Sequence, residues 1–152
     1  MIYKPKDFEL YEFLPEDFYE TYKHRGMKLW LIFDIRVLIT SQRLRERYGR
    51  MIMNDYHWGG IHQERGYRNF YTKTGALFSQ HKFGRGGDSK FSDVTPDEIR
   101  EDIQKHPDDE TFEFITCIEE AIGWFHFDTR NWDKTKSGIL IVRPKVLIAR
   151  PK

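Results

Sequence analysis

Two histidines and an aspartate lie in settings that suit metal ligation. His81 and Asp88 are seven positions apart, and Gly84, Gly86 and Gly87 lie between them. Neutral imidazole and carboxylate groups are good zinc ligands, and glycines let a chain turn tightly and approach a metal closely. The same stretch would also suit a glycine-rich surface turn with an ordinary histidine and a solvated aspartate. A second motif is therefore needed to favour a metal site.

The second motif is the segment 124–128, of sequence WFHFD. In a strand, His126 and Asp128 would point to one face while Phe125 and Phe127 point to the other. Burying such a polar pair requires partners, and a metal ion would supply one. The alternative is a core histidine that is hydrogen-bonded to Asp128.

Together the two motifs predict a catalytic type of metal site. His81, Asp88 and His126 supply three protein ligands and leave one position open, which is the arrangement of a catalytic zinc. Structural zinc sites usually fill four positions, often with cysteine, and Cys117 is the one cysteine of the chain. Zinc is the expected cofactor, although manganese or iron would also suit two histidines and a carboxylate.

The elements that must position these residues predict an α+β fold. Short helices are expected within 7–22, a longer helix over 27–48, and a helix from a Thr95 cap to about Lys105, with Glu98 completing a capping box. Strands are expected at 50–56, 88–91, 111–119, 123–129, 137–142 and 146–149. The expected order along the chain is helices first, then mostly antiparallel strands with one inserted helix. This order favours a small antiparallel sheet.

Length and charge limit the classes of function. A chain of 152 residues suits one domain, here predicted over 27–152 with an N-terminal extension over 1–26. The formal net charge of +1 gives no overall electrostatic footprint for nucleic acid. The most apolar run, 29–39, is too short to span a bilayer, and the first residues lack the apolar region of a signal peptide. We therefore expect cytoplasmic synthesis without a signal peptide, and neither nucleic acid nor membrane as a partner.

The motifs resemble those of a known enzyme family. The segment from Ser79 to Asp88 resembles the Ser-x-His-x-x-Gly-x-Ala-x-Asp signature of the D-alanyl-D-alanine carboxypeptidase-like zinc metallopeptidases, with Gly86 in place of the alanine. His126-x-Asp128 is similar to the His-x-Asp ending of one branch of that family, whose fold is the hedgehog/DD-peptidase fold.

The resemblance extends upstream to the residues that line the site in this family. Gly66-Tyr67-Arg68 resembles the family's Ser-Gly-Tyr-Arg segment, with Arg65 in place of the serine. The similarity covers residues 29–132. It implies zinc binding by the two histidines and the aspartate, and metal-assisted hydrolysis of peptidoglycan stem peptides or cross-links. It further implies that Arg68 binds or polarises the substrate, together with Tyr67 and Ser79.

The general base is the weak part of this match. Many members of the family carry a glutamate three residues before the last histidine, or a histidine two before it, and these positions here are Gly123 and Trp124. Asp128, Glu119 or Glu120 could serve instead, although the spacing does not decide which. Asp128 could also orient a metal ligand rather than move a proton.

Three functions follow as hypotheses. The first is a phage lysin or virion-associated lysin, a peptidase that acts at the cell wall after lysis or as part of a virion. The second is a structural virion or assembly protein that keeps the fold and the metal site without turnover, with other virion proteins as partners. The third is a module that binds cell-wall peptide without cutting it.

Overall fold

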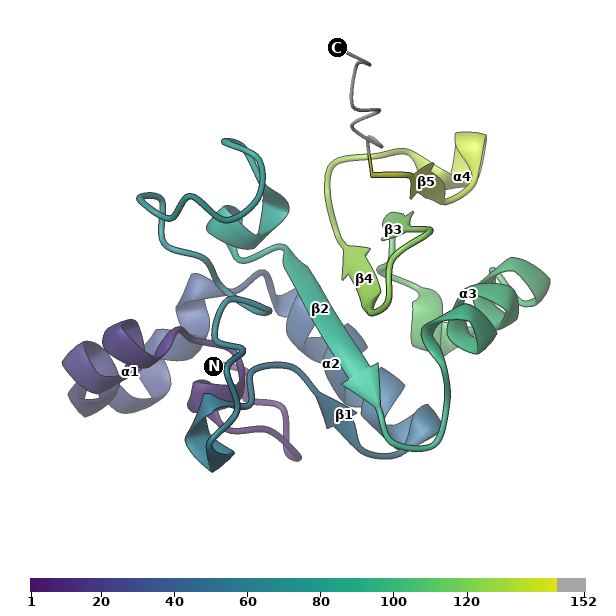
Figure 1. Cartoon of the computed structure of the whole chain (residues 1–152). Helices are drawn as coiled ribbons and strands as arrows, with labels where there is room; N and C mark the ends of the chain where they lie inside the picture. Colours follow the sequence, from purple (N-terminus) through teal and green to yellow (C-terminus); the bar gives the residue numbers. More distant parts are fainter. Residues whose placement is uncertain (145–152) are drawn as a thin grey trace, which may run out of the picture.

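The fold is built on a five-stranded mixed sheet, seen in a computed structural model that describes residues 1–144 (Figure 1). The strands are β1 (Met51–Ile52), β2 (Gly86–Phe91), β3 (Cys117–Glu119), β4 (Phe125–Asp128) and β5 (Leu140–Val142). Their order in the sheet is β1-β2-β4-β3-β5. The α+β class is confirmed, and each of five predicted segments contains or overlaps a strand. β2 begins before the predicted 88–91, and only the end of 111–119 is a strand, because a 3-10 turn (Glu110–Phe112) covers its start. The sixth segment, 146–149, lies outside the described residues.

The expectation of an antiparallel sheet is wrong at one edge. The pairs β1–β2, β2–β4 and β3–β4 are antiparallel, whereas β3 and β5 are parallel, with Cys117 opposite Leu140. The chain leaves β4 beside the start of β3, because Asp128 pairs with Cys117. The segment 129–139 then carries the chain around that end of β3. As a result, β5 starts where β3 starts and runs in the same direction.

Helical segments surround this sheet. The α-helices are α1 (Glu16–Tyr22), α2 (Ile35–Tyr48), α3 (Pro96–Lys105) and α4 (Lys134–Ser137). The 3-10 segments are η1 (Leu10–Glu12), η2 (Lys23–Ile32), η3 (Tyr56–Trp58), η4 (Gln80–Phe83) and η5 (Glu110–Phe112). The inserted helix α3 is confirmed, with the Thr95–Glu98 capping box in place. No helix in this described part of the chain is both long and apolar enough to cross a bilayer.

The single helix predicted over 27–48 is wrong in its first third. Phe33 is extended, and Asp34 caps a new helix, α2, by accepting a hydrogen bond from the backbone N–H of Arg36 at 3.0 Å. The backbone N–H of Asp34 is directed elsewhere, to the carbonyl of Gly84 at 2.9 Å. An aspartate side chain at this position favours the start of a new helix over the continuation of the preceding one. The hydrophobic periodicity of 27–48 therefore continues across a break in the helix. At the other end, Gly49 terminates α2 at a φ of 81°, a backbone conformation that glycine adopts readily.

The core lies between α2 and one face of the sheet. Phe125 and Phe127 of β4 are fully buried in it, together with Val37 and Leu44 of α2. The segment 1–26, predicted as an extension, contributes to the same core through Phe8, Phe13 and Leu14. Because β4 alternates, the burial of its two phenylalanines turns His126 and Asp128 to the opposite face.

Candidate metal centre

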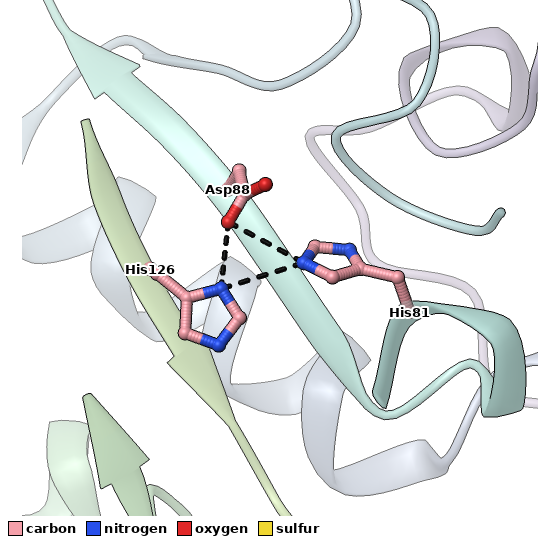
Figure 2. Close-up of side chains that lie close together, drawn as sticks. All are labelled: His81, Asp88 and His126. Atoms are coloured by element: carbon pink, nitrogen blue, oxygen red, sulfur yellow. Dashed lines mark hydrogen bonds and ion pairs between the residues drawn. The ribbon is translucent and has the colours of Figure 1, made fainter. Parts of the chain in front are cut away.

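His81, Asp88 and His126 converge on one point beside β2 and β4 (Figure 2). Their side-chain donors are His81 Nε2, Asp88 Oδ1 and His126 Nδ1. The His81 nitrogen lies 3.4 Å from the Asp88 oxygen and 3.4 Å from the His126 nitrogen. The His126 nitrogen lies 2.6 Å from the same Asp88 oxygen. All three residues are buried, with exposed fractions of 2%, 5% and 8%.

These separations fit a metal ion. Ligand atoms bound to tetrahedral zinc at about 2.0–2.1 Å lie about 3.3 Å from one another. Two of the three separations have that length, and the third is a direct hydrogen bond between His126 and Asp88. A small outward movement of one side chain would complete the triangle. The donor set, two imidazoles and one carboxylate, also suits zinc chemically.

Strand pairing brings two of the ligands together. Asp88 on β2 lies directly opposite His126 on β4 in an antiparallel pair, and paired side chains share a face of the sheet. His81 comes from η4, whose last residue is followed by Gly84 at a φ of 64°. A Cβ at this position would lie 2.2 Å from the carbonyl oxygen of Ile32, so only glycine allows this turn. The turn returns the chain to β2 within a few residues of His81.

A backbone carbonyl fixes the tautomer of His81. Its Nδ1 lies 2.7 Å from the carbonyl oxygen of Gly66, which can only accept, so Nδ1 carries the hydrogen and Nε2 presents its lone pair. Burial lowers the pKa of His81 from its ordinary value of 6.5, against the opposing effect of the Asp88 carboxylate. The ring is thus held neutral, as a metal ligand must be.

His126 is oriented from behind by Asp128. Its Nε2 lies 3.2 Å from Asp128 Oδ2, which leaves Nδ1 to face the other ligands. The guanidinium of Arg130 holds the Asp128 carboxylate through Nε at 2.8 Å and Nη2 at 2.5 Å. Burial opposes ionisation of Asp128, but the hydrogen bonds from Arg130 and His126 lower its pKa to about 2. A carboxylate behind a ligating histidine is the usual support of a metal site.

Two carboxylates make His126 basic in the absence of a metal. Burial lowers its pKa, but hydrogen bonds to Asp128 and Asp88 outweigh burial and raise the pKa to about 9. The pKa of Asp88 is held far below its ordinary range, because the two histidines outweigh its burial. A cation bound at the centre of this triad would therefore displace the proton that His126 carries in the metal-free protein.

Arg68 supports the third ligand. Its Nη2 donates to Asp88 Oδ2 at 2.8 Å, while the other oxygen of Asp88 faces the histidines. Its Nε donates to the carbonyl of Glu64 at 2.7 Å. These two contacts fix the guanidinium beside the metal centre and leave Nη1 for other partners. The structure therefore places Arg68 beside the triad, and its role in substrate binding stays a prediction.

The triad lies in a cavity of about 470 Å³. Ser79, Asp128, Arg68 and Glu119, all predicted as site residues, line this cavity. Tyr67 does not line it: its ring packs against Phe18 and Phe33. The structure therefore gives no support to the predicted role of Tyr67 in substrate binding. Cys117 also lines the cavity but is fully buried, and burial raises the pKa of its thiol to about 12.

Glu119 is presented by the sheet and anchored by α3. It lies directly across from His126 in the β3–β4 pair. The buried guanidinium of Arg100 on α3 binds three carbonyls of this hairpin: Nε donates to Glu119 at 2.9 Å, and Nη2 donates to Ile122 at 3.2 Å and to Trp124 at 2.5 Å. Sequence reasoning missed Arg100, because nothing local to α3 indicates what lies across from it.

Arg130 and the Gly66 carbonyl were also not assigned roles from the sequence. Arg130 follows Asp128 by two residues at the end of a strand. This spacing allows a bidentate contact between the guanidinium and the carboxylate, so the sequence does contain a signal for the role of Arg130. The Gly66 carbonyl carries no such signal, because main-chain acceptors are identical along the chain.

No family model matches this chain, and neither the curated proteins nor the solved structures include a significant match to it.

Proposed function

We propose that this protein is a zinc-dependent peptidase that cleaves peptide bonds in peptidoglycan stem peptides or cross-links. The observation that carries the proposal is the buried His81–Asp88–His126 triad, whose donor atoms converge at separations of 2.6–3.4 Å on the wall of a large cavity. Three protein ligands leave a position for water or substrate, as in catalytic zinc sites. The support for zinc is the donor chemistry and the neutral state of His81.

The residues around the triad supply the remaining parts of a hydrolase. Bound zinc would polarise the scissile carbonyl and lower the pKa of an attacking water to about 7. Glu119 would take the proton of that water and pass it to the leaving nitrogen. Nη1 of Arg68 would donate to the oxygen on which negative charge develops. Asp128 would hold His126 in the ligating tautomer, and Ser79 would contact the substrate.

The substrate class rests on the resemblance of the two motifs and of the Gly66-Tyr67-Arg68 segment to the D-alanyl-D-alanine carboxypeptidase-like peptidases. We extend the proposal to the hedgehog/DD-peptidase fold and to the biological setting of that group: a phage lysin or virion-associated lysin that meets the cell wall after lysis or from a virion. The cavity, at about 470 Å³, has room for several residues of a stem peptide.

A second candidate is a structural virion or assembly protein that keeps the metal without turnover. The observation that favours it is the pair Gly123 and Trp124, which stand where many relatives place a proton-transferring side chain. Trp124 lines the cavity and cannot act as a base. The two candidates differ in whether Glu119 acts as the proton-transferring residue in place of positions 123 and 124.

The deciding experiment is zinc content measured together with hydrolysis of purified peptidoglycan. Wild type, His81→Ala and the control His24→Ala are compared, since His24 is exposed and lies outside the site. We expect one zinc per chain and new peptide termini in wild type and in the control, and neither in His81→Ala. Zinc without cleavage would favour the structural role or a cell-wall binding module. A well-folded wild-type protein that binds no zinc would overturn the proposal.

A further inference from the structure

A second cavity adjoins the metal centre. Its volume is about 420 Å³, and it shares Arg68, Thr74, Asp88 and Trp124 with the cavity that contains the triad. Arg65 lines only the second cavity. A peptide bound across the metal centre would therefore continue into the second cavity, and the residues there would contact a part of the substrate away from the scissile bond.

Arg65 lines this second cavity and forms no ion pair within the described part of the chain. Its guanidinium is half-buried, and its side-chain contact is a long one, from Nη1 to the carbonyl of Met53 at 3.4 Å. No carboxylate of residues 1–144 lies within ion-pair distance of it. Burial lowers the pKa of Arg65 and outweighs the longer-range attraction of Asp55 and Asp88, so residues 1–144 do not fully offset its desolvation.

None of the acidic groups near Arg65 forms an ion pair with it among residues 1–144, because other contacts hold each of them. Asp88 is paired with Arg68 and faces the metal centre. Glu64 accepts a hydrogen bond from Thr74 Oγ1 at 2.5 Å. Asp55 accepts one from the backbone N–H of His62 at 2.7 Å, and it acts on Arg65 only at longer range. Among the charged residues that line the second cavity, Arg68 is paired with Asp88, whereas Arg65 has no ion-pair partner in residues 1–144 and is free to bind an incoming anion.

We propose that the second cavity is a subsite for a carboxylate carried by the substrate, with Arg65 as the residue that selects it. The inference rests on the proposed peptidase function. A guanidinium matches a carboxylate through two parallel hydrogen bonds. A neutral carboxamide in the same place would leave the cation unpaired, and a site built this way discriminates strongly against such an analogue. The expected substrate is thus a peptide with a free carboxylate near the scissile bond.

The test uses two synthetic stem peptides that are identical except that one free carboxylate of the first is a carboxamide in the second. Wild type should cleave the carboxylate form about 10–100-fold better in kcat/KM, mainly through KM. Arg65→Gln should reduce that preference to below about threefold and leave cleavage of the carboxamide form nearly unchanged. Arg65→Lys should recover part of the preference, and Arg25→Gln, a change at an exposed arginine outside the site, should retain all of it.

The outcomes separate the subsite from the activity. Equal cleavage of both peptides by wild type would overturn the subsite while leaving the peptidase proposal in place. If wild type cleaves neither peptide, the peptidase proposal fails, and calorimetry then decides the subsite. If wild type binds the carboxylate form more tightly than the carboxamide form, and Arg65→Gln loses this difference, the subsite is supported. Equal binding, or no binding, would overturn it.

Discussion

Glu119 lies directly across from His126, and His126 lies directly across from Asp88, so the three residues form one row over β3, β4 and β2. Side chains that pair directly across strands point to the same face of a sheet. The row therefore places the Glu119 carboxylate beside two of the three residues that could hold a metal ion. Within the described part of the chain, no hydrogen-bond donor contacts the Glu119 carboxylate.

Replacement of Glu119 by glutamine should separate catalysis from metal binding. The amide cannot accept a proton, so kcat on peptidoglycan peptide should fall by about 10²–10⁴-fold, while zinc stoichiometry stays at the wild-type value. The matched control is Glu120→Gln, because Glu120 pairs with Arg143 instead. Full activity in Glu119→Gln would rule out this residue as the base.

Replacement of Asp128 by asparagine should weaken zinc binding. The variant loses the carboxylate that orients His126 and pairs with Arg130, and losses of such supporting groups cost about 10–100-fold in metal affinity. The affinity is measured by competition with a chromophoric chelator. Asp133→Asn, at an exposed position, is the control and should bind zinc as wild type does. Unchanged affinity in Asp128→Asn would remove the orienting role.

Zinc affinity should rise with pH. In the metal-free protein His126 holds a proton with a pKa of about 9, and that proton must leave before Nδ1 can bind zinc. The apparent affinity should therefore increase by about tenfold per pH unit from about pH 6 to about pH 8, with release of one proton per zinc. Chelator competition at several pH values measures the slope, and a flat profile would contradict it.

The metal-free protein should show the opposite trend in stability. The folded-state pKa of His126 is raised from 6.5 to about 9, so protonated His126 contributes stability that is fully present below pH 6.5. That contribution is lost as the pH rises through about 9. Urea unfolding of chelator-treated protein measures this trend. In His126→Gln the decline over this range should disappear.

Loss of the Arg100 guanidinium should destabilise the whole domain. Arg100→Met keeps much of the side-chain volume but leaves the carbonyls of Glu119, Ile122 and Trp124 without this donor. A buried group left unsatisfied costs about 1–3 kcal/mol. Because these three carbonyls are only partly buried and water can replace part of the lost contacts, the free energy of unfolding should fall by about 2–4 kcal/mol in total. Arg143→Met, at an exposed arginine, should change it by less than about 0.5 kcal/mol.

The cluster of His81, Asp88 and His126, which could hold a metal ion, could be predicted from the sequence because its signal is local. His81 and Asp88 lie within one short segment, and the alternation of WFHFD indicates which side of β4 is polar. The helix α3 was also predictable, since its capping box involves residues three positions apart.

The remaining features depend on pairing between distant segments. The choice of Glu119 over Glu120 follows from the register of β3 with β4, which a shift of one residue would reverse. The parallel placement of β5 follows from the path of 129–139, and the break before α2 from a contact between Asp34 and Gly84. Hydrophobic periodicity carries no information about either contact.

Two residues of the triad and the groups proposed to face a substrate come from different kinds of backbone. Asp88 and His126 stand on paired strands, whereas Arg65, Arg68 and Thr74 come from the segment between η3 and η4, which has no regular secondary structure. Loops accept substitutions and insertions more readily than strands do. Under the proposed function, variation in residues 59–79 would therefore redirect which peptide is recognised without moving Asp88 and His126. Homologous chains should diverge most in that segment and least along the β2–β4 pair.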